Sequence, residues 1–324
     1  MKAIVQDHYG SPDVLEFRDL GRPSPGAGEV LVRVHAAGVD PGVRHLTTGH
    51  PYLLRLLGFG LRRPKLPVRG LDFAGTVKEI GDGVTRVRPG DEVFGVCEGA
   101  FAEYAVAKQD LVAAKPGRLS FEQAAAVPVS GSTALQALRD VGRVQPGQRV
   151  LVIGAAGGVG SFAVQLAQAF GAEVTGVCST AKTDVVRSLG AEHVVDYTRE
   201  DFAAQQYDLI VDTAGLRSLS ALRRALTPRG SLVIVGGENG GKWLGGIQRV
   251  FRAALLNPLV RQRLRGLVAR VRGADLDDLR DLIEAGRLTP VLDRTYPLAD
   301  AAAALGHLHA GRAAGKVVLT VLTT

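Results

Sequence analysis

The sequence predicts an α/β protein in which a β-rich part precedes a doubly wound parallel sheet. Three observations lead to this prediction. Short β-type runs broken by Pro and Gly fill residues 1–120, helical and strand patterns alternate from Ser120 onward, and a glycine-rich turn joins a strand to a helix near residue 154. Strands that alternate with helices are typical of a parallel sheet covered by helices on both faces.

The glycine-rich turn follows a short apolar run at residues 149–153. Its residues are Gly154, Ala155, Ala156, Gly157, Gly158, Val159 and Gly160. Apolar residues then recur at helical spacing as far as Phe170, Gly171 ends that helix, and residues 174–178 give a second strand. Such a unit lets backbone approach a pyrophosphate closely and points a helix N-terminus at it. We therefore expect a dinucleotide site here; the alternative is a structural glycine turn in another α/β protein.

The end of the second strand bears on the choice of cofactor. NAD sites usually carry an acid about 20 residues after the glycines, where it binds the ribose 2′-hydroxyl. Here Cys178 is followed by Ser179, Thr180, Ala181 and Lys182, which offer two hydroxyls and one cation and no acid. These side chains suit a 2′-phosphate, and Tyr197, at the end of the third strand, is a further candidate to reach it. We expect NADPH rather than NADH; the alternative is an ordinary polar loop that caps a helix.

Length and composition set further limits. The 324 residues suffice for two domains, and 46% hydrophobic with 22% charged residues is ordinary for a globular enzyme. Cys97 and Cys178 are the only cysteines and lie far apart, which excludes a disulfide framework and a clustered-cysteine zinc site. The N-terminal residues do not resemble a signal peptide, and no apolar run reaches the roughly 18 residues of a membrane span. We expect no transmembrane segment and a cytoplasmic location.

The net charge of +7 gathers in residues 242–272, which hold one Lys, seven Arg and no acid. Apolar residues are interleaved with these cations, so the stretch is a candidate for contact with an anionic membrane surface or with nucleic acid. The simpler interpretation, which we favour, is a packed helical segment with a solvated cationic face. We accordingly expect no nucleic-acid partner and only a weak tendency toward membrane surfaces.

The individual elements follow in chain order. In the first part the pattern predicts strands over residues 2–5, 14–17, 30–37, 70–80 and 100–106. Residues 47–67 form an apolar and basic loop interrupted by Gly and Pro, which is a candidate wall of a substrate pocket. The second part adds strands over 193–197, 207–212 and 231–235. A helix over 276–285 is followed by residues 291–296, 299–309 and 316–321, which we expect to return to the first part. The expected domains are 1–122, 123–272 and a C-terminal segment, 273–324.

Several short motifs occur in a characteristic order. They are GLDFAG at 70–75, RPGDEVF at 88–94, AFAEY at 100–104, AVP at 126–128, STAL at 132–135, VQPGQ at 144–148, the glycine-rich turn, LGA at 189–191, VDTAG at 211–215 and GKVVL at 315–319. In this order the chain resembles the medium-chain dehydrogenase/reductase superfamily, in its zinc-free quinone oxidoreductase-like branch. The resemblance implies a GroES-like catalytic domain built from both chain ends, a Rossmann domain between them, a nicotinamide in the cleft and an oligomer, which we expect to be a homodimer.

The resemblance also implies site residues. The expected cleft residues are Asp40, Tyr52, Phe94, Thr133, Gly236, Trp243 and Lys316, with Tyr52 and Asp40 as the catalytic candidates. The expected cofactor-binding residues are Thr133, Gly154, Ala155, Gly157, Gly158, Val159, Gly160, Ser179, Thr180, Lys182, Tyr197, Ala214, Gly236, Gly237 and Lys316. Tyr52 is either a hydrogen-bond donor to a carbonyl or a pocket wall. Relatives in this branch often carry Asn where Asp40 stands.

The positions that hold zinc in metal-dependent relatives correspond here to Asp40, residues 70–72 and the region 129–132. One or two Asp residues do not replace the Cys and His ligands of catalytic zinc, so we expect no metal. Without a Lewis acid, alcohol oxidation is disfavoured, and hydride transfer from NADPH to a small hydrophobic enone or quinone is the expected reaction. The alternatives are a metal-free carbonyl or alcohol oxidoreductase, and a non-catalytic NADPH-binding protein whose basic stretch binds RNA or membrane.

Overall fold

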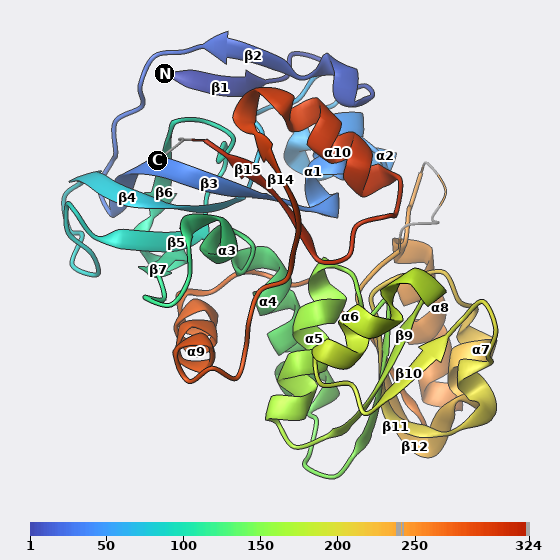
Figure 1. Cartoon of the computed structure of the whole chain (residues 1–324). Helices are drawn as coiled ribbons and strands as arrows, with labels where there is room; N and C mark the ends of the chain where they lie inside the picture. Colours follow the sequence, from blue (N-terminus) through green and yellow to red (C-terminus); the bar gives the residue numbers. More distant parts are fainter. Residues whose placement is uncertain (238–240, 242, 322–324) are drawn as a thin grey trace. The chain divides into compact units, whose positions relative to one another are not determined.

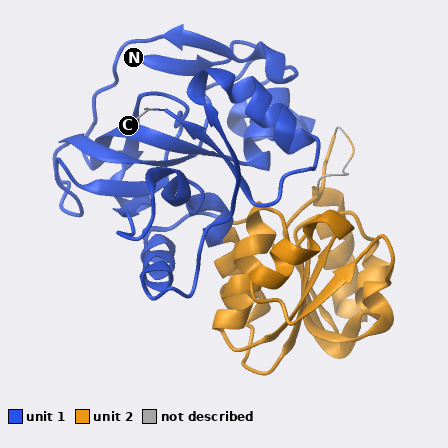
Figure 2. Cartoon of the chain, in the orientation of Figure 1, with its two compact units in different colours: residues 1–132, 270–324 blue, residues 133–269 orange. Residues whose placement is uncertain are grey.

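The structure, a computed structural model, describes residues 1–237, 241 and 243–321, and in these residues the chain divides into two units (Figure 1, Figure 2). The first unit holds both ends of the chain, Met1–Ser132 and Arg270–Thr324, and the second is the continuous segment Thr133–Ala269. The first boundary lies after Ser132 rather than after residue 122 because helix α3 (Phe121–Ala125) packs on the sheet of the first unit. The Phe121 ring stacks there on His35, with 4.0 Å between the ring centroids.

The first unit is built around the long strand β3 (Glu29–Val39). Within the described residues its main sheet has the order β14-β15-β3-β4-β5-β7, and β6 also pairs with β3. Only the pair β14 and β15 is parallel. The other strands are β4 (Asp72–Ile80), β5 (Glu92–Val96), β6 (Tyr104–Lys108), β7 (Val112–Ala114), β14 (Leu292–Pro297) and β15 (Lys316–Thr320), with β1 (Lys2–Val5) and β2 (Glu16–Asp19) forming a separate hairpin.

Short helices connect and cover these strands. They are η1 (Pro12–Val14), α1 (Pro41–Thr48), α2 (Tyr52–Leu54), η2 (Arg55–Phe59), η3 (Gln109–Leu111), α9 (Gly273–Glu284), η8 (Leu298–Asp300) and α10 (Ala301–His309), and α4 (Pro128–Leu135) continues from the first unit into the second. On β3 the valines at positions 30, 32 and 34 alternate toward the core, where they join Phe73 and Val77 of β4. Leu31 between them is fully buried as well, and Arg33 is the one exposed residue of β3, so the strand is covered on both faces.

The second unit is a parallel sheet with the order β10-β9-β8-β11-β12-β13 in the described residues. Its strands are β8 (Arg149–Ile153), β9 (Glu173–Cys178), β10 (His193–Asp196), β11 (Tyr207–Asp212), β12 (Leu226–Ile234) and β13 (Arg263–Gly266). Its helices are η4 (Gln136–Gly142), α5 (Gly158–Ala169), η5 (Thr180–Lys182), α6 (Thr183–Ser188), η6 (Phe202–Ala204), α7 (Leu219–Arg224), α8 (Ile247–Leu256) and η7 (Asn257–Leu259). Val150, Leu151 and Val152 are all fully buried, as expected for a central parallel strand covered on both faces.

Some predicted boundaries differ from the structure. The strand predicted over 14–17 is wrong at its start, because Pro12 begins the short helix η1, Val14 ends it, and β2 begins only at Glu16. The strand predicted from residue 100 begins at Tyr104. The described part of the basic stretch is not helical throughout, because Arg263–Gly266 forms the edge strand β13. In the described residues, no helix is both long enough and apolar enough to span a bilayer.

Candidate active site

The glycine-rich turn lies between β8 and α5, and β8 is a central strand of the parallel sheet. Gly154 has a φ of +81°, a conformation that L side chains rarely adopt. A Cβ atom on Gly160 would lie 2.0 Å from the carbonyl oxygen of Gly154, closer than any side chain could approach. Glycine at both positions therefore lets the helix begin directly against the strand that precedes it.

The start of α5 suits a diphosphate group. Gly157 precedes the helix, and the first turn, which includes Gly158, Val159 and Gly160, contains no acidic side chain. The N–H groups of a first helical turn have no intrahelical acceptor and lie at the positive end of the helix dipole. A Cβ atom on Gly157 would lie 3.3 Å from the carbonyl oxygen of Gly154, which is a tight contact, so glycine at this position lets the turn pack closely on itself. Ala155 is buried and its N–H donates to Val177 of β9.

The predicted 2′-phosphate residues follow β9. Ser179 and the short helix η5 place Thr180 and Lys182 directly after the strand. An acid that the local sequence does not suggest lies beside them: the Thr180 hydroxyl donates to Asp196 across 2.5 Å. Asp196 ends β10, and the parallel register sets it opposite Cys178. Its other oxygen accepts from the N–H and the hydroxyl of Thr198, so the described contacts use both carboxylate oxygens.

The Asp196 carboxylate is held in its ionised form. The hydrogen bond from the Thr180 hydroxyl is the main reason that the pKa of Asp196 lies below its usual range, and the Thr198 N–H and hydroxyl add to it. Asp196 therefore fixes the loop after β9. Sequence reasoning missed it because the search for an acid covered only the residues adjacent to β9, whereas the pairing of β9 with β10 brings in a residue 16 positions later.

A second residue that the sequence did not reveal is Arg217. Its guanidinium lies over the ring of Tyr197, 5.4 Å from the centroid, and near Phe202 at 5.6 Å. Tyr197 is about half exposed, and its N–H donates to the carbonyl of Cys178. Arg217 thus adds a cation to the group of Ser179, Thr180, Lys182 and Tyr197. Arg217 reaches this group because the loop that follows β11 lies beside the end of β10.

The other predicted cofactor residues of this unit follow β11 and β12. Ala214 adjoins Gly154, since a Cβ atom on Gly154 would lie 3.3 Å from the Ala214 side chain. A Cβ atom on Gly236 would lie 1.9 Å from the carbonyl oxygen of Thr213, and one on Gly237 would lie 2.3 Å from the Cα atom of Gly246. These glycines let neighbouring backbones touch. Thr133, on α4, is nearly buried, and Trp243 is 71% exposed.

In the first unit, Asp40, Asp72, Ser130 and Lys316 form a buried ionic cluster. The Lys316 ammonium donates to Asp40 Oδ1, to Asp72 Oδ2 at 3.3 Å and to Ser130 Oγ at 3.2 Å. The Ser130 hydroxyl donates to Asp40 Oδ1 at 3.1 Å, and the Val129 N–H donates to Asp72 Oδ1 at 3.1 Å. All four residues are buried, with exposed fractions of 4% or less.

Strand pairing brings the cluster together. Asp72 begins β4 and Lys316 begins β15, and both strands are antiparallel neighbours of β3, whose last residue immediately precedes Asp40. Gly38 pairs with Asp72, and a Cβ atom on Gly38 would lie 2.9 Å from the Asp72 side chain. Glycine at position 38 therefore makes room for the carboxyl group. The predicted roles of Asp40 and Lys316 did not include a bond between them.

The cluster has two carboxyl groups but only one cation, so the pKa values of the two carboxyl groups shift in opposite directions. Burial, together with the charge of Asp40, raises the pKa of Asp72 well above its usual range. Burial alone would also raise the pKa of Asp40, but the Lys316 ammonium and hydrogen bonds from Asp72, Lys316 and Ser130 outweigh it and lower that pKa. The two carboxylates likewise outweigh burial and raise the pKa of Lys316. Lys316 thus pairs with Asp40, and Asp72 is the carboxyl group that holds its proton more strongly.

The contacts of the cluster do not fit a bound zinc ion. Among the described residues, no group of three or more His, Cys, Asp and Glu side chains is placed to hold a metal. The two acids at the expected metal position are already bonded to Lys316. Nearby Cys97 is buried, which with the charges of Asp72 and Glu98 raises the pKa of its thiol well above the usual range.

Tyr52 lies at the start of the helical segment α2–η2, within the predicted pocket loop. The Arg55 guanidinium lies 4.9 Å from its ring centroid, and the His50 ring meets it edge-on at 4.7 Å. Leu56, Leu57 and Phe59 follow on η2 and are 43–69% exposed, so this segment presents an apolar surface. Phe94, by contrast, is fully buried.

Two family models match the chain. The one described as an alcohol dehydrogenase GroES-like domain matches residues 26–117, and the one described as a zinc-binding dehydrogenase matches residues 189–319. The first match lies within the first unit and carries β3 to β7, and the second runs from the parallel sheet through β15.

Similar proteins cover nearly the whole chain. A quinone oxidoreductase from Coxiella burnetii, whose structure has been solved, is 31% identical with a TM-score of 0.87, and the match covers 99% of each chain. A mycobacterial protein solved in complex with NADPH is 30% identical with a TM-score of 0.83, over 99% of this chain and 100% of that one. A 2-methylene-furan-3-one reductase from Solanum lycopersicum is 33% identical over 337 residues, which are 98% of this chain and 79% of that protein.

Proposed function

Because the chain belongs to the medium-chain dehydrogenase/reductase superfamily, in its quinone oxidoreductase-like branch, it is an oxidoreductase that uses a nicotinamide cofactor, and we propose that it is an NADPH-dependent, zinc-free reductase of enones or quinones. The observation that carries the proposal is the ionic cluster. Lys316 already neutralises the carboxylate that a metal would need. A reaction that needs a strong Lewis acid is therefore a poor match, whereas conjugate reduction requires only a hydrogen-bond donor at the oxygen.

The second unit supports NADPH as the cofactor. When bound, the cofactor supplies the hydride. The first turn of α5 binds the diphosphate, and Ser179 and Lys182 bind the 2′-phosphate, assisted by Arg217 and Tyr197. The Thr180 hydroxyl, which donates to Asp196, shapes this loop and does not donate to the phosphate. Asp196 does not compete for the ribose, because its carboxylate oxygens hold Thr180 and Thr198.

We assign the substrate side to the first unit. The apolar surface of η2 suits a hydrophobic enone or quinone, and one relative is named for the reduction of an enone of this kind. Tyr52 donates a hydrogen bond to the substrate oxygen as negative charge develops there, and water supplies the α-proton. Asp40 and Lys316 neutralise one another, so we assign them to positioning the junction of β3, β4 and β15 rather than to proton transfer or cofactor contact.

Isotope labelling tests the reaction directly. NADPH oxidation is followed over a panel of enones, quinones and aldehydes, and deuterated NADPH is then used with the best enone. We expect deuterium at the carbon β to the carbonyl and solvent hydrogen at the α-carbon. Deuterium at the carbonyl carbon with the alkene intact would make the protein a carbonyl reductase instead. Activity that is lost in chelator and restored by zinc would contradict the zinc-free assignment.

The Tyr52→Phe variant tests the donor. If Tyr52 stabilises the developing charge, kcat should fall by about 10²-fold, the scale of losing one oxyanion donor. If Tyr52 is only a wall of the pocket, the change should be a few-fold and mostly in KM. Tyr104→Phe, on β6, is the matched control and should leave both constants unchanged.

A further inference from the structure

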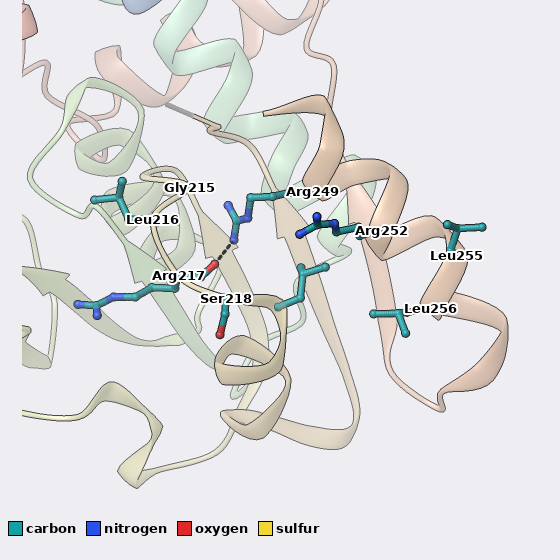
Figure 3. Close-up of a pocket in the computed structure, with 9 residues that line it drawn as sticks. Gly215, Leu216, Arg217, Ser218, Arg249, Arg252, Leu255 and Leu256 are labelled. Carbon is teal, nitrogen blue, oxygen red and sulfur yellow. Dashed lines mark hydrogen bonds between the residues drawn. The ribbon is translucent and has the colours of Figure 1, made fainter. Parts of the chain in front are cut away.

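The second unit contains a pocket whose lining shares Arg217 with the proposed cofactor site. It lies between the loop that follows β11 and helix α8, has a volume of about 660 Å³, and is lined by residues 215–219 together with Arg249, Arg252, Leu255 and Leu256 (Figure 3). That volume is in the range of small-molecule sites, about 300–1,000 Å³. All of its lining residues belong to one unit.

One buried carboxylate organises both walls. Asp212, at the end of β11, is fully buried; its Oδ1 accepts the Gly215 N–H at 3.0 Å and its Oδ2 accepts Arg249 Nη2 at 2.7 Å. The same Nη2 donates to the carbonyl oxygen of Arg217 at 2.8 Å. The loop and the helix are thus fixed to each other through Asp212 and Arg249, so the pocket is preformed.

The other guanidinium nitrogen of Arg249 is unused. The Arg249 side chain is only 16% exposed, and its Nη1 atom is buried and has no hydrogen-bond partner among the described residues. A buried guanidinium donor without an acceptor is costly, and most such donors in proteins are satisfied. An acceptor brought by a ligand into this pocket, which Arg249 lines, would satisfy it.

The charge and polarity of the walls define the ligand. Asp212 neutralises Arg249, and Arg252 is exposed and points from α8 toward Arg249 in Figure 3. Arg217 also belongs to the lining, so the walls carry a net positive charge. The remaining wall is apolar, with Leu216 58% and Leu255 74% exposed. A charge-assisted hydrogen bond to Arg requires an anionic oxygen, and the leucines require an apolar body.

We propose that this pocket binds an amphipathic anion, a carboxylate or phosphate head group on an alkyl chain, with the head at Arg249 and Arg252 and the chain over Leu216 and Leu255. Apart from Arg217, the site is separate from the proposed cofactor site. The Arg217 side chain leaves the loop toward Tyr197 and Phe202, on the side away from Arg249 in Figure 3. NADPH and the amphipathic anion should therefore bind together.

Calorimetric titration of the full chain tests the proposal. The probes are decanoate and decyl phosphate below their micelle concentrations, with decyltrimethylammonium as a probe of the same chain length and opposite charge. We expect at least tenfold tighter binding of an anionic probe than of the cationic one, with saturating NADPH present. The tighter of the two anions identifies the head group. Equal binding of anion and cation, or loss of binding in NADPH, would overturn the proposal.

Two exposed-residue variants should fold normally and locate the site. Arg252→Gln and Leu255→Asp should each weaken binding of the anion at least tenfold, whereas Arg229→Gln, an exposed arginine on β12, should change it less than twofold. Unchanged binding in both pocket variants would place the ligand elsewhere. Sedimentation of the parent and of Leu255→Asp is the second readout. If no probe binds specifically and the parent is a dimer that Leu255→Asp dissociates, a second copy of the chain covers this surface and the proposal is overturned.

Discussion

The ionic cluster of the first unit and the Asp212–Arg249 pair of the second unit both bury a carboxylate beside a cation, but in different proportions. In the cluster, two carboxyl groups share one Lys, and burial raises the pKa of one of them, Asp72, well above its usual range. In the pair, one carboxylate meets one Arg and leaves a guanidinium nitrogen without an acceptor in the described residues. Asp40 Oδ2 in the cluster also lacks a partner among the described residues, but Arg249 belongs to the lining of a pocket, where a ligand can supply an acceptor.

Lys316→Met should have the largest effect, because it leaves Asp40 buried without a cation. Breaking a buried ion pair typically costs about 3–5 kcal/mol of unfolding free energy, and urea unfolding of the variant measures it. The double variant Lys316→Met with Asp40→Asn is the control and should recover much of the loss, since the unpaired charge is then gone. A single variant within about 1 kcal/mol of the parent would mean that the cluster is not a charged unit.

Arg249→Met should lower the unfolding free energy by less, about 2–3 kcal/mol. Asp212 still accepts the hydrogen bond from the Gly215 N–H and loses only the bond from Arg249. Thermal or urea unfolding checks this value. Arg252→Met, which removes an exposed arginine from the same helix, should stay within about 0.5 kcal/mol of the parent. A larger loss for Arg249→Met than for Lys316→Met would reverse the ranking of the two sites.

The pH dependence of stability distinguishes the sites further. The pKa of Asp72 is raised in the folded state, so its contribution is complete below its unfolded pKa, about 3.9, and is lost as pH rises toward the folded pKa. Asp72→Asn removes that titration while keeping an acceptor for the Val129 N–H. Unfolding free energies at pH 5, 6.5 and 8 should therefore shift in favour of the variant as pH rises, by up to about 1.4 kcal/mol per pH unit. A constant difference would show that Asp72 is not protonated.

The smallest expected effect is on a ligand rather than on the fold. Lys182→Ala should weaken NADPH binding about tenfold, roughly 1.4 kcal/mol, and leave NADH binding and the unfolding temperature almost unchanged. Fluorescence titration with both cofactors measures this effect. Arg187→Ala, on α6, is the matched control and should not alter either affinity. Equal affinity of the unaltered protein for NADPH and NADH would contradict the assignment of this subsite.

The sequence predicts what local chemistry determines. The glycine turn, the strand before it and the helix after it lie within about twenty residues, and the structure has all three where the pattern put them. The contacts of Asp40 with Lys316, of Thr180 with Asp196 and of Arg217 with Tyr197 depend instead on which strands and loops become neighbours. A single sequence carries no local signal of such pairing, so Asp196 and Arg217 were missed and Lys316 was assigned only to the cofactor.

The position of β15 has a consequence for synthesis of the chain. This strand pairs with both β14 and β3, and it carries a cation that lies 244 residues after Asp72. At roughly 5–20 residues per second a ribosome takes about 12–50 s to cover that distance. During this interval Asp40 and Asp72 have no ammonium partner, and the edge of β3 that β15 will occupy is open. The continuous second unit can fold as it emerges, while the first unit, begun first, must be finished last.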